Sequence, residues 1–153
     1  MEPTNRRRVV RALEVTLGSG RPFSSFGDGV ANFPPTDIRQ IGLRWSRPQL
    51  SRRIEMRVHR MVEAGLVDEV RALLAEATPM SATARQALGY KEIIEHLEGV
   101  TTLEAAVDKV ILRTRQFAVR QERWFRRDPR IKWVSISEDP VGEIVPVVAK
   151  HLR

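Results

Sequence analysis

Apolar residues recur along most of the chain with the three- and four-residue spacing of amphipathic helices, interrupted by two short extended runs. This spacing predicts helices over residues 6–17, 47–64, 66–77, 83–98, 101–127 and 141–151. The runs at residues 38–45 and 131–136 are predicted to be strands. Two strands are fewer than a sheet usually has, so the chain is expected to be mostly helical or to carry an incomplete sheet.

Glycine, proline and hydroxyl residues predict where several of these helices begin and end. Gly18 and Gly20 are expected to stop the first helix. Thr83 and Thr101 each stand three residues before a glutamine or glutamate, which is the spacing of a helix-capping box. Residues 18–37 are rich in Gly, Ser and Pro and are predicted to form an exposed, mobile loop.

The chain is strongly basic. Of its 153 residues 29% are charged, the net charge is +7, and arginine supplies most of the cations. Arginine binds phosphate through two donors at once and stacks on bases, so nucleic acid is the first candidate partner. A solvated surface in an arginine-rich protein is the alternative that charge alone leaves open.

Several kinds of site and location are not expected from this composition. There is no cysteine, which excludes a disulfide framework, a thiolate nucleophile and a cysteine zinc site. The three histidines (His59, His96 and His151) lack metal-ligand spacing, so no zinc is expected. No apolar run approaches the ~20 residues that span a bilayer, and the basic N-terminus lacks the apolar stretch of a signal peptide. We therefore expect a cytoplasmic location and no membrane partner.

The longest predicted helix presents two different faces. Its apolar arc holds Val107, Val110, Ile111, Phe117, Ala118, Trp124 and Phe125, and its basic arc holds Arg113, Arg120, Arg123 and Arg127. No acid follows these arginines at i+4, so they repel one another unless an anion binds, which favours RNA binding over a solvated face. Gln121 falls inside the apolar arc, where anchoring a neighbouring loop and facing a base are equally compatible with the sequence.

Two further basic groups are more ambiguous. Arg53, Arg57 and Arg60 edge the apolar face of the helix at 47–64, where they would either extend to solvent or hold a diphosphate. The N-terminal helix carries a third cluster at Arg6, Arg7, Arg8 and Arg11. No phosphate-binding G-x-x-x-x-G-K-[ST] loop occurs, and the acids lie among charged neighbours, so no general base can be named.

Four segments, in order, resemble tRNA dimethylallyltransferases (tRNA isopentenyltransferases of the IPP transferase family). They are RRRVVRALEV (6–15) followed by SGRPFS (19–24), RRIEMRVHRM (52–61), RQALGYKE (85–92) and TRQFAVRQERWFRRD (114–128). Each segment alone is weak, whereas four in order are specific. The segments extend from near the start of the chain to Asp128.

The resemblance implies an α/β fold like that of P-loop kinases, of which residues 1–153 would form a single C-terminal portion, mostly helical with about two strands. Such enzymes transfer a dimethylallyl group from dimethylallyl diphosphate to the exocyclic amine of the adenine 3′ of the anticodon, and the base is flipped out for the reaction. The family's glycine-rich loop, its Mg²⁺, its general-base aspartate and an inserted tRNA-gripping region would all precede this chain. The isolated chain is therefore expected to be inactive, and a non-catalytic, truncated RNA-binding module is the alternative.

The resemblance also implies site residues. Arg57 matches an arginine associated with the diphosphate and the reaction channel, and Arg53 is a secondary candidate on the diphosphate side. The expected contacts to the tRNA anticodon stem-loop are Arg7, Arg8, Arg11, Gln86, Gly89, Tyr90, Lys91, Arg120, Gln121, Arg123, Trp124 and Arg126. The chain departs from the family at Val119, where lysine is usual, and at Arg123, where a smaller residue is common. No metal ligand is expected here, and the full-length family is expected to be monomeric.

Overall fold

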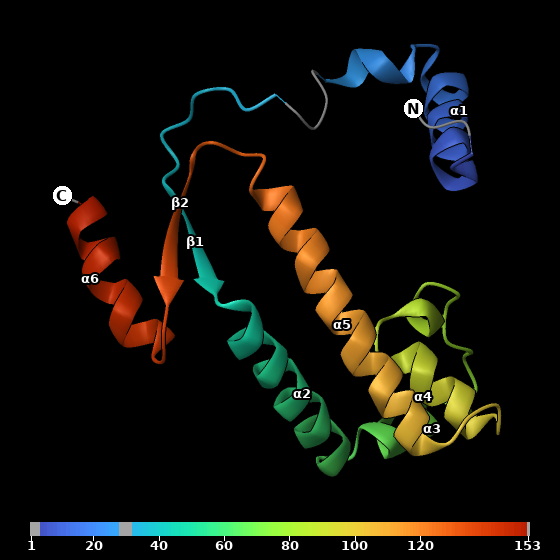
Figure 1. The fold of residues 1–153 in the computed structure, drawn as a ribbon. Coiled ribbons are helices and arrows are strands. Elements are labelled where there is room, and N and C mark those ends of the chain that lie inside the picture. The colour runs from blue at the N-terminus through green and yellow to red at the C-terminus, as the bar shows by residue number, and fades with distance from the viewer. Residues whose placement is uncertain (1–3, 28–31, 153) are drawn as a thin grey trace.

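The computed structural model describes residues 4–27 and 32–152, and it contains all six predicted helices and both predicted strands (Figure 1). In chain order the elements are α1 (Arg6–Ser19), the 3-10 turn η1 (Phe23–Phe26), β1 (Gln40–Trp45), α2 (Arg47–Glu63), α3 (Leu66–Ala75), the 3-10 turn η2 (Ala84–Gln86), α4 (Tyr90–Leu97), α5 (Leu103–Phe125), β2 (Ile131–Ile136) and α6 (Pro140–Leu152). None of the described helices is both long and apolar enough to cross a membrane.

The two strands pair in parallel, with Gln40 opposite Ile131 and Trp45 opposite Ile136. Parallel strands need a long crossover, and here α2 to α5 supply it. Gly42 permits the close pairing, because a Cβ at this position would lie 2.7 Å from the Trp133 ring. In the described part of the chain the sheet stops at these two strands, so the expected incomplete sheet is confirmed.

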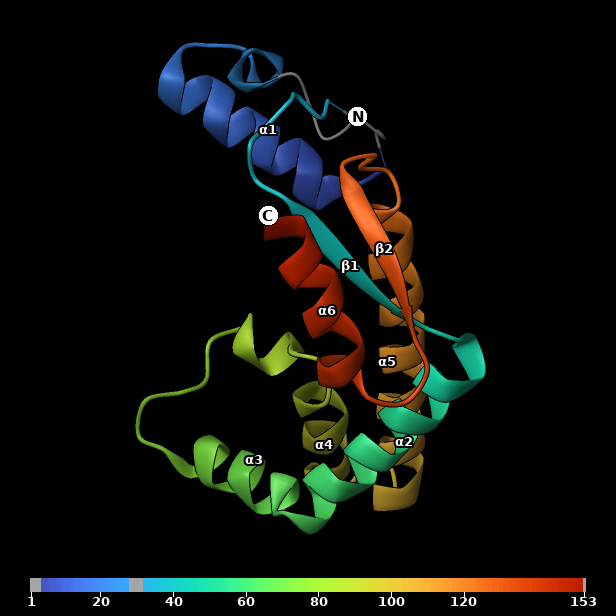
Figure 2. The ribbon, with the colours of Figure 1, turned by 90° about the vertical axis from the view of Figure 1, so that its left-hand side faces the viewer.

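The core lies in the crossover helices rather than on the sheet. Ile54 and Val58 of α2 pack against Val107, Val110 and Ile111 of α5. A second cluster joins Leu66 and Val70 of α3 to Ile93 and Ile94 of α4. The half-buried residues Val62 and Leu103 pack against both clusters, which makes α2 to α5 one continuous helical lobe (Figures 1 and 2).

Helix α1 stands apart from this lobe. It packs against η1, buries no residue fully, and lies at the opposite end of the molecule from α3 and α4 in both views (Figures 1 and 2). Gly20 ends the helix in a left-handed conformation as predicted, but Gly18 does not stop it. The predicted loop at 18–37 contains η1 and is exposed where described, except for the half-buried Phe33. Residues 28–31 lie outside the described residues, and the mobility of the loop stays a prediction.

Two predicted helix starts are wrong. Thr83 precedes only the 3-10 turn η2 and caps nothing with its side chain. Helix α4 instead begins at Tyr90 behind Gly89, whose N–H is bound by the Glu92 side chain. Helix α5 is capped by Thr102 rather than Thr101, because the Thr102 hydroxyl accepts from the Ala105 N–H. The N-cap of α5 is therefore shifted by one residue, whereas that of α4, Gly89, lies six residues beyond Thr83.

The apolar arc of α5 is core only along the first half of the helix. Fully buried residues end at Ile111, and Ala118 is the last residue that packs against the α2–α5 cluster. Phe117, Trp124 and Phe125 are 45%, 50% and 47% exposed, which corrects the expectation that they belong to the core. The second half of α5 therefore carries large aromatic side chains that are exposed to solvent.

Candidate nucleic-acid interface

The second half of α5 and the turn that follows it combine these exposed aromatic rings with three arginines, Arg120, Arg123 and Arg127, which we call the arginine stripe. No carboxylate among the described residues pairs with any of the three. The Arg120 guanidinium lies 5.9 Å from the Phe117 ring centroid, and that of Arg127 lies 5.4 Å from the Trp124 ring. Cations and exposed rings side by side are suited to binding single-stranded nucleic acid, because the cations contact its phosphates and the rings stack on its unpaired bases.

Arg113, which the sequence places in the same basic arc, does not belong to the stripe. Its guanidinium is bound to the carboxylate of Glu92, from α4, and its side chain is only 36% exposed. The expectation that the arc lacks acidic partners considered only acids on α5, whereas this acid comes from a neighbouring helix. Arg113 is thus a structural cation.

Glu122 lies close to three other arginines near this end of α5. Its carboxylate lies 3.1 Å from Arg47, 3.7 Å from Arg44 and 4.0 Å from Arg126. Arg126, an expected tRNA contact, is therefore partly engaged within the protein. The Arg44 guanidinium also stacks over the Trp133 ring at 5.1 Å, so this cluster joins both strands to α5.

Gln121 is exposed and lines a hollow of about 590 Å³ between β1 and the end of α5, together with Phe125 and Trp133. Its side chain makes no hydrogen bond within the described part of the chain, so it does not anchor a loop there. The interpretation that it faces a base stays a prediction.

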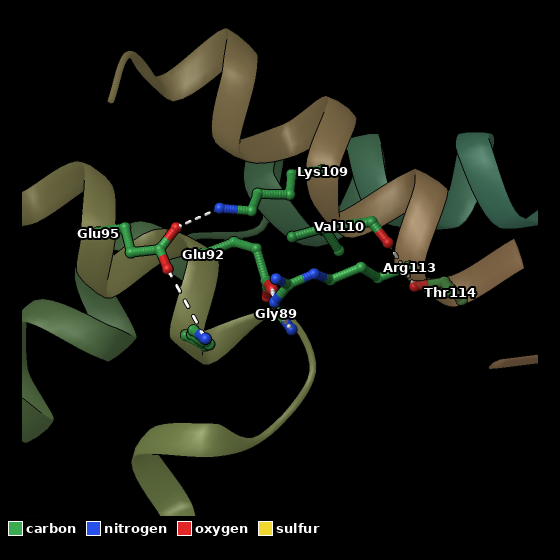
Figure 3. Close-up of polar contacts among 8 residues, drawn as sticks. Gly89, Glu92, Glu95, Lys109, Val110, Arg113 and Thr114 are labelled. Carbon is green, nitrogen blue, oxygen red and sulfur yellow. Dashed lines mark hydrogen bonds and ion pairs between the residues drawn. The ribbon is translucent and has the colours of Figure 1, made fainter. Parts of the chain in front are cut away.

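The segment 86–91, where four tRNA contacts are expected, is held against α5 (Figure 3). The Gly89 N–H donates to the fully buried carboxylate of Glu92 at 2.9 Å, and the other oxygen of that carboxylate binds Arg113. Gly89 has a φ of +97°, which side chains rarely adopt, so the turn requires glycine. One turn along α4, Glu95 binds Lys109 at 2.6 Å.

Two expected contacts in this segment already have partners. The Tyr90 hydroxyl donates to Glu69, and this hydrogen bond, helped by burial, raises the pKa of Tyr90. Lys91 lies 4.0 Å from Glu95. The hydrogen bond from Lys109 holds the pKa of Glu95 below its ordinary value. Gln86 is exposed, and its side chain has no partner within the described residues.

The segment 86–91 lies at one end of the arginine stripe. Arg113, which holds the segment through Glu92, is seven residues from Arg120 on the same helix, and Arg127 lies in the turn just beyond the end of α5. At 1.5 Å of rise per residue the step from Arg113 to Arg120 is about 10 Å, with little rotation around the axis. We therefore expect the segment 86–91 and the arginine stripe to lie along the same side of α5.

The structure does not bring the third set to this surface. Arg7 and Arg8 are exposed on α1, Arg11 pairs with Glu14 at 3.3 Å, and the helix lies away from α4 (Figure 2). On α2, Arg57 is exposed and has no carboxylate partner among the described residues. Arg53 stacks on Trp45 at 4.2 Å beside an open hollow.

Arg60 is exposed, and its Nε donates to the Met56 carbonyl at 3.2 Å on its own helix, so its role stays a prediction. Sequence reasoning also missed Glu92 and Glu122, the two acids that organise this region. For Glu92 the usable signal was the Gly-x-x-Glu spacing from Gly89, which matches a helix-capping pattern. Glu122 has no such signal, because its partners Arg44 and Arg47 come from β1 and α2.

The described residues offer no metal site. In that part of the chain no three His, Cys, Asp or Glu side chains converge, and the carboxylates at this interface are bound to arginine or lysine. Mg²⁺ prefers an oxygen cage with carboxylates free to bind it. The residues described here therefore do not fit a Mg²⁺ site.

Comparison with known proteins adds a family to this geometry. The family model for IPP transferase matches residues 1–128. The chain is 48% identical over 151 residues to the tRNA dimethylallyltransferase of Thermobifida fusca, covering 97% of this chain and 46% of that protein. It is 49% identical over 137 residues to the tRNA dimethylallyltransferase of Streptomyces coelicolor, covering 87% and 42%. The chain thus spans about half the length of these curated relatives, and it corresponds to their C-terminal part.

Solved structures give the same result. The full-length tRNA isopentenylpyrophosphate transferase of Bacillus halodurans superposes with a TM-score of 0.70 at 33% identity, over 99% of this chain and 46% of that one. The tRNA delta(2)-isopentenylpyrophosphate transferase of Staphylococcus epidermidis superposes with a TM-score of 0.69 at 30% identity, over 99% of this chain and 50% of that one. These likenesses confirm the predicted α/β fold class.

Proposed function

This chain belongs to the IPP transferase family, and from that premise we propose that it forms the tRNA-reading part of a tRNA dimethylallyltransferase. The reaction proposed for the whole enzyme moves a dimethylallyl group from dimethylallyl diphosphate to the exocyclic amine of the adenine 3′ of the anticodon. The C–O bond to the diphosphate breaks, a C–N bond forms, and the amine loses a proton. This chain supplies RNA contacts rather than the base that takes that proton.

One observation carries the proposal: the arginine stripe lacks carboxylate partners in the described chain and lies beside an exposed tryptophan. Elsewhere on this basic protein many arginines are paired, including Arg47, Arg113 and Arg115. Cations without internal partners repel one another until a polyanion neutralises them, and RNA is the polyanion that the family acts on. Trp124 offers a stacking surface of the kind on which unpaired bases bind.

Arg57 and Arg53 are the proposed contacts to the diphosphate side of the reaction. Both project from α2, and the described chain gives Arg57 no carboxylate partner, which leaves its two-pronged guanidinium available to an oxyanion. Mg²⁺, which would neutralise the diphosphate, is assigned to residues other than those described. We also propose that α1 contacts the tRNA through Arg7 and Arg8 and that the enzyme acts in the cytoplasm.

The test is binding of this chain to an anticodon stem-loop that carries the target adenine, measured across a salt series beside a scrambled hairpin. We expect preference for the cognate loop and an affinity that falls steeply as salt rises. Equal binding of both hairpins, or binding that ignores salt, would contradict the proposed RNA-reading role. In the same samples, we expect no transfer from radiolabelled dimethylallyl diphosphate, and detectable prenylation would overturn the assignment of catalysis to other residues.

A further inference from the structure

Glu92 is the only charged side chain that is fully buried among the residues described. Its two carboxylate oxygens face two different donors, the Gly89 N–H at 2.9 Å and the Arg113 guanidinium (Figure 3). Gly89 lies in the segment 86–91, whereas Arg113 lies on α5 below the arginine stripe. One carboxylate therefore connects the two parts of the interface.

Helix capping alone does not account for this arrangement. A cap at the start of α4 needs one acceptor for the Gly89 N–H and no partner from another helix. Stability does not require the ion pair either, because a buried pair is often replaced by apolar residues without loss. What the arrangement adds is a fixed position: the Glu92 carboxylate holds the turn at Gly89 opposite Arg113 on α5.

We propose that Glu92 is a positioning residue for RNA recognition, which holds the segment 86–91 in register with the arginine stripe. This inference rests on the proposed function, since it assumes that the segment and the stripe contact one RNA. The exposed Gln86 is then presented to the RNA at a fixed distance from Arg120. Glu92 itself is buried and touches no ligand.

The position requires a carboxylate because donors face both of its oxygens. In Glu92→Gln, the amide NH₂ would have to face either the Gly89 N–H or Arg113, so one hydrogen bond is lost. In Arg113→Met, the carboxylate remains buried without a cation. In the double variant the NH₂ no longer meets a guanidinium, and the introduced amide oxygen is free to accept from Gly89.

The experiment measures the affinity of four variants for the cognate stem-loop at one salt concentration and at a temperature where circular dichroism shows them folded. The variants are E92Q, R113M, E92Q/R113M and the control E55Q, which breaks an α2–α5 ion pair with Arg115 and touches neither Gly89 nor Lys91. We expect about tenfold weaker binding for each of the first two, as for one lost charge-assisted hydrogen bond. The double variant and E55Q are expected to bind like the wild type.

Amide hydrogen exchange at Gly89 supplies an independent readout that needs no RNA. We expect its exchange to be slow in the wild type, faster in E92Q, and slow again in the double variant. Unchanged affinity and exchange in E92Q, or a folded double variant that stays as weak as E92Q, would overturn the positioning role. E92Q buries no charge, so it decides the question even where R113M does not fold. A wild type that fails to prefer the cognate loop would instead refute the proposed function itself.

Discussion

Removing the arginine stripe tests the proposed interface most directly. In R120A/R123A/R127A three cations are lost that have no carboxylate partner among the described residues, so no internal ion pair of the described chain is broken. The matched control is R71A, which removes a cation that Asp68 already neutralises on α3. Both changes lower the net charge, and only the first removes proposed phosphate contacts.

The expected effect follows from counterion release. Each phosphate contact to a flexible strand contributes about 0.7 to the slope of log affinity against log salt concentration, so three contacts contribute about 2. At ~0.1 M salt the same contacts are worth on the order of a hundredfold in affinity. The triple variant should therefore bind about a hundredfold more weakly, with a slope smaller by about 2.

Fluorescence anisotropy of a labelled anticodon stem-loop, titrated at several salt concentrations, measures both quantities. The R71A control is expected to keep the wild-type slope, because its cation already has a partner. A triple variant that retains the wild-type slope would show that the stripe is a solvated face and would refute the reasoning. A decrease of the slope in R71A that is one third of the decrease in the triple variant, in proportion to the charge removed, would show that net charge, rather than the stripe, governs binding.

Three further predictions concern the scaffold. Gly42→Ala places a methyl group 2.7 Å from the Trp133 ring, so the free energy of unfolding in urea should fall by about 1–3 kcal/mol. An unchanged unfolding midpoint would contradict the tight strand pairing. Ile93→Ala leaves a cavity at a fully buried site and should lower the free energy of unfolding by about 2–5 kcal/mol. The control V100A, at an exposed position, should change it little. Hydrogen bonds from the backbone N–H groups of Glu138 and Ser137 lower the pKa of Glu143 in the folded protein. The ionised Glu143 carboxylate therefore stabilises the folded state fully above the ordinary glutamate pKa of about 4.3, and this contribution is lost as the pH falls through the lowered pKa. The stability difference between the wild type and E143Q should therefore shrink on acidification, and a constant difference would contradict this.

Local sequence determined the secondary structure of this protein. Periodicity was sufficient for α2 over nearly its whole length, because the hydrogen bonds of a helix join residues within one turn. A short apolar run was sufficient to locate β2 at residues 131–136, although its partner strand β1 lies far away in the chain. Gly20 ended α1 as expected because left-handed backbone is a property of the residue itself. The choice between Thr101 and Thr102 as a cap was not determined, since adjacent hydroxyl residues both fit the pattern.

Tertiary structure decided which charges are available. Arg113 and Arg120 are seven residues apart on one helix, yet only Arg113 meets a buried acid, because α4 packs against the first half of α5 and not the second. Arg47 and Arg44 approach Glu122 only because β1 pairs with β2 beside the end of α5. The sequence thus determined that the protein is basic and helical. Which arginines are left for RNA depends on contacts between residues far apart in the chain, and helical periodicity carries no information about such contacts.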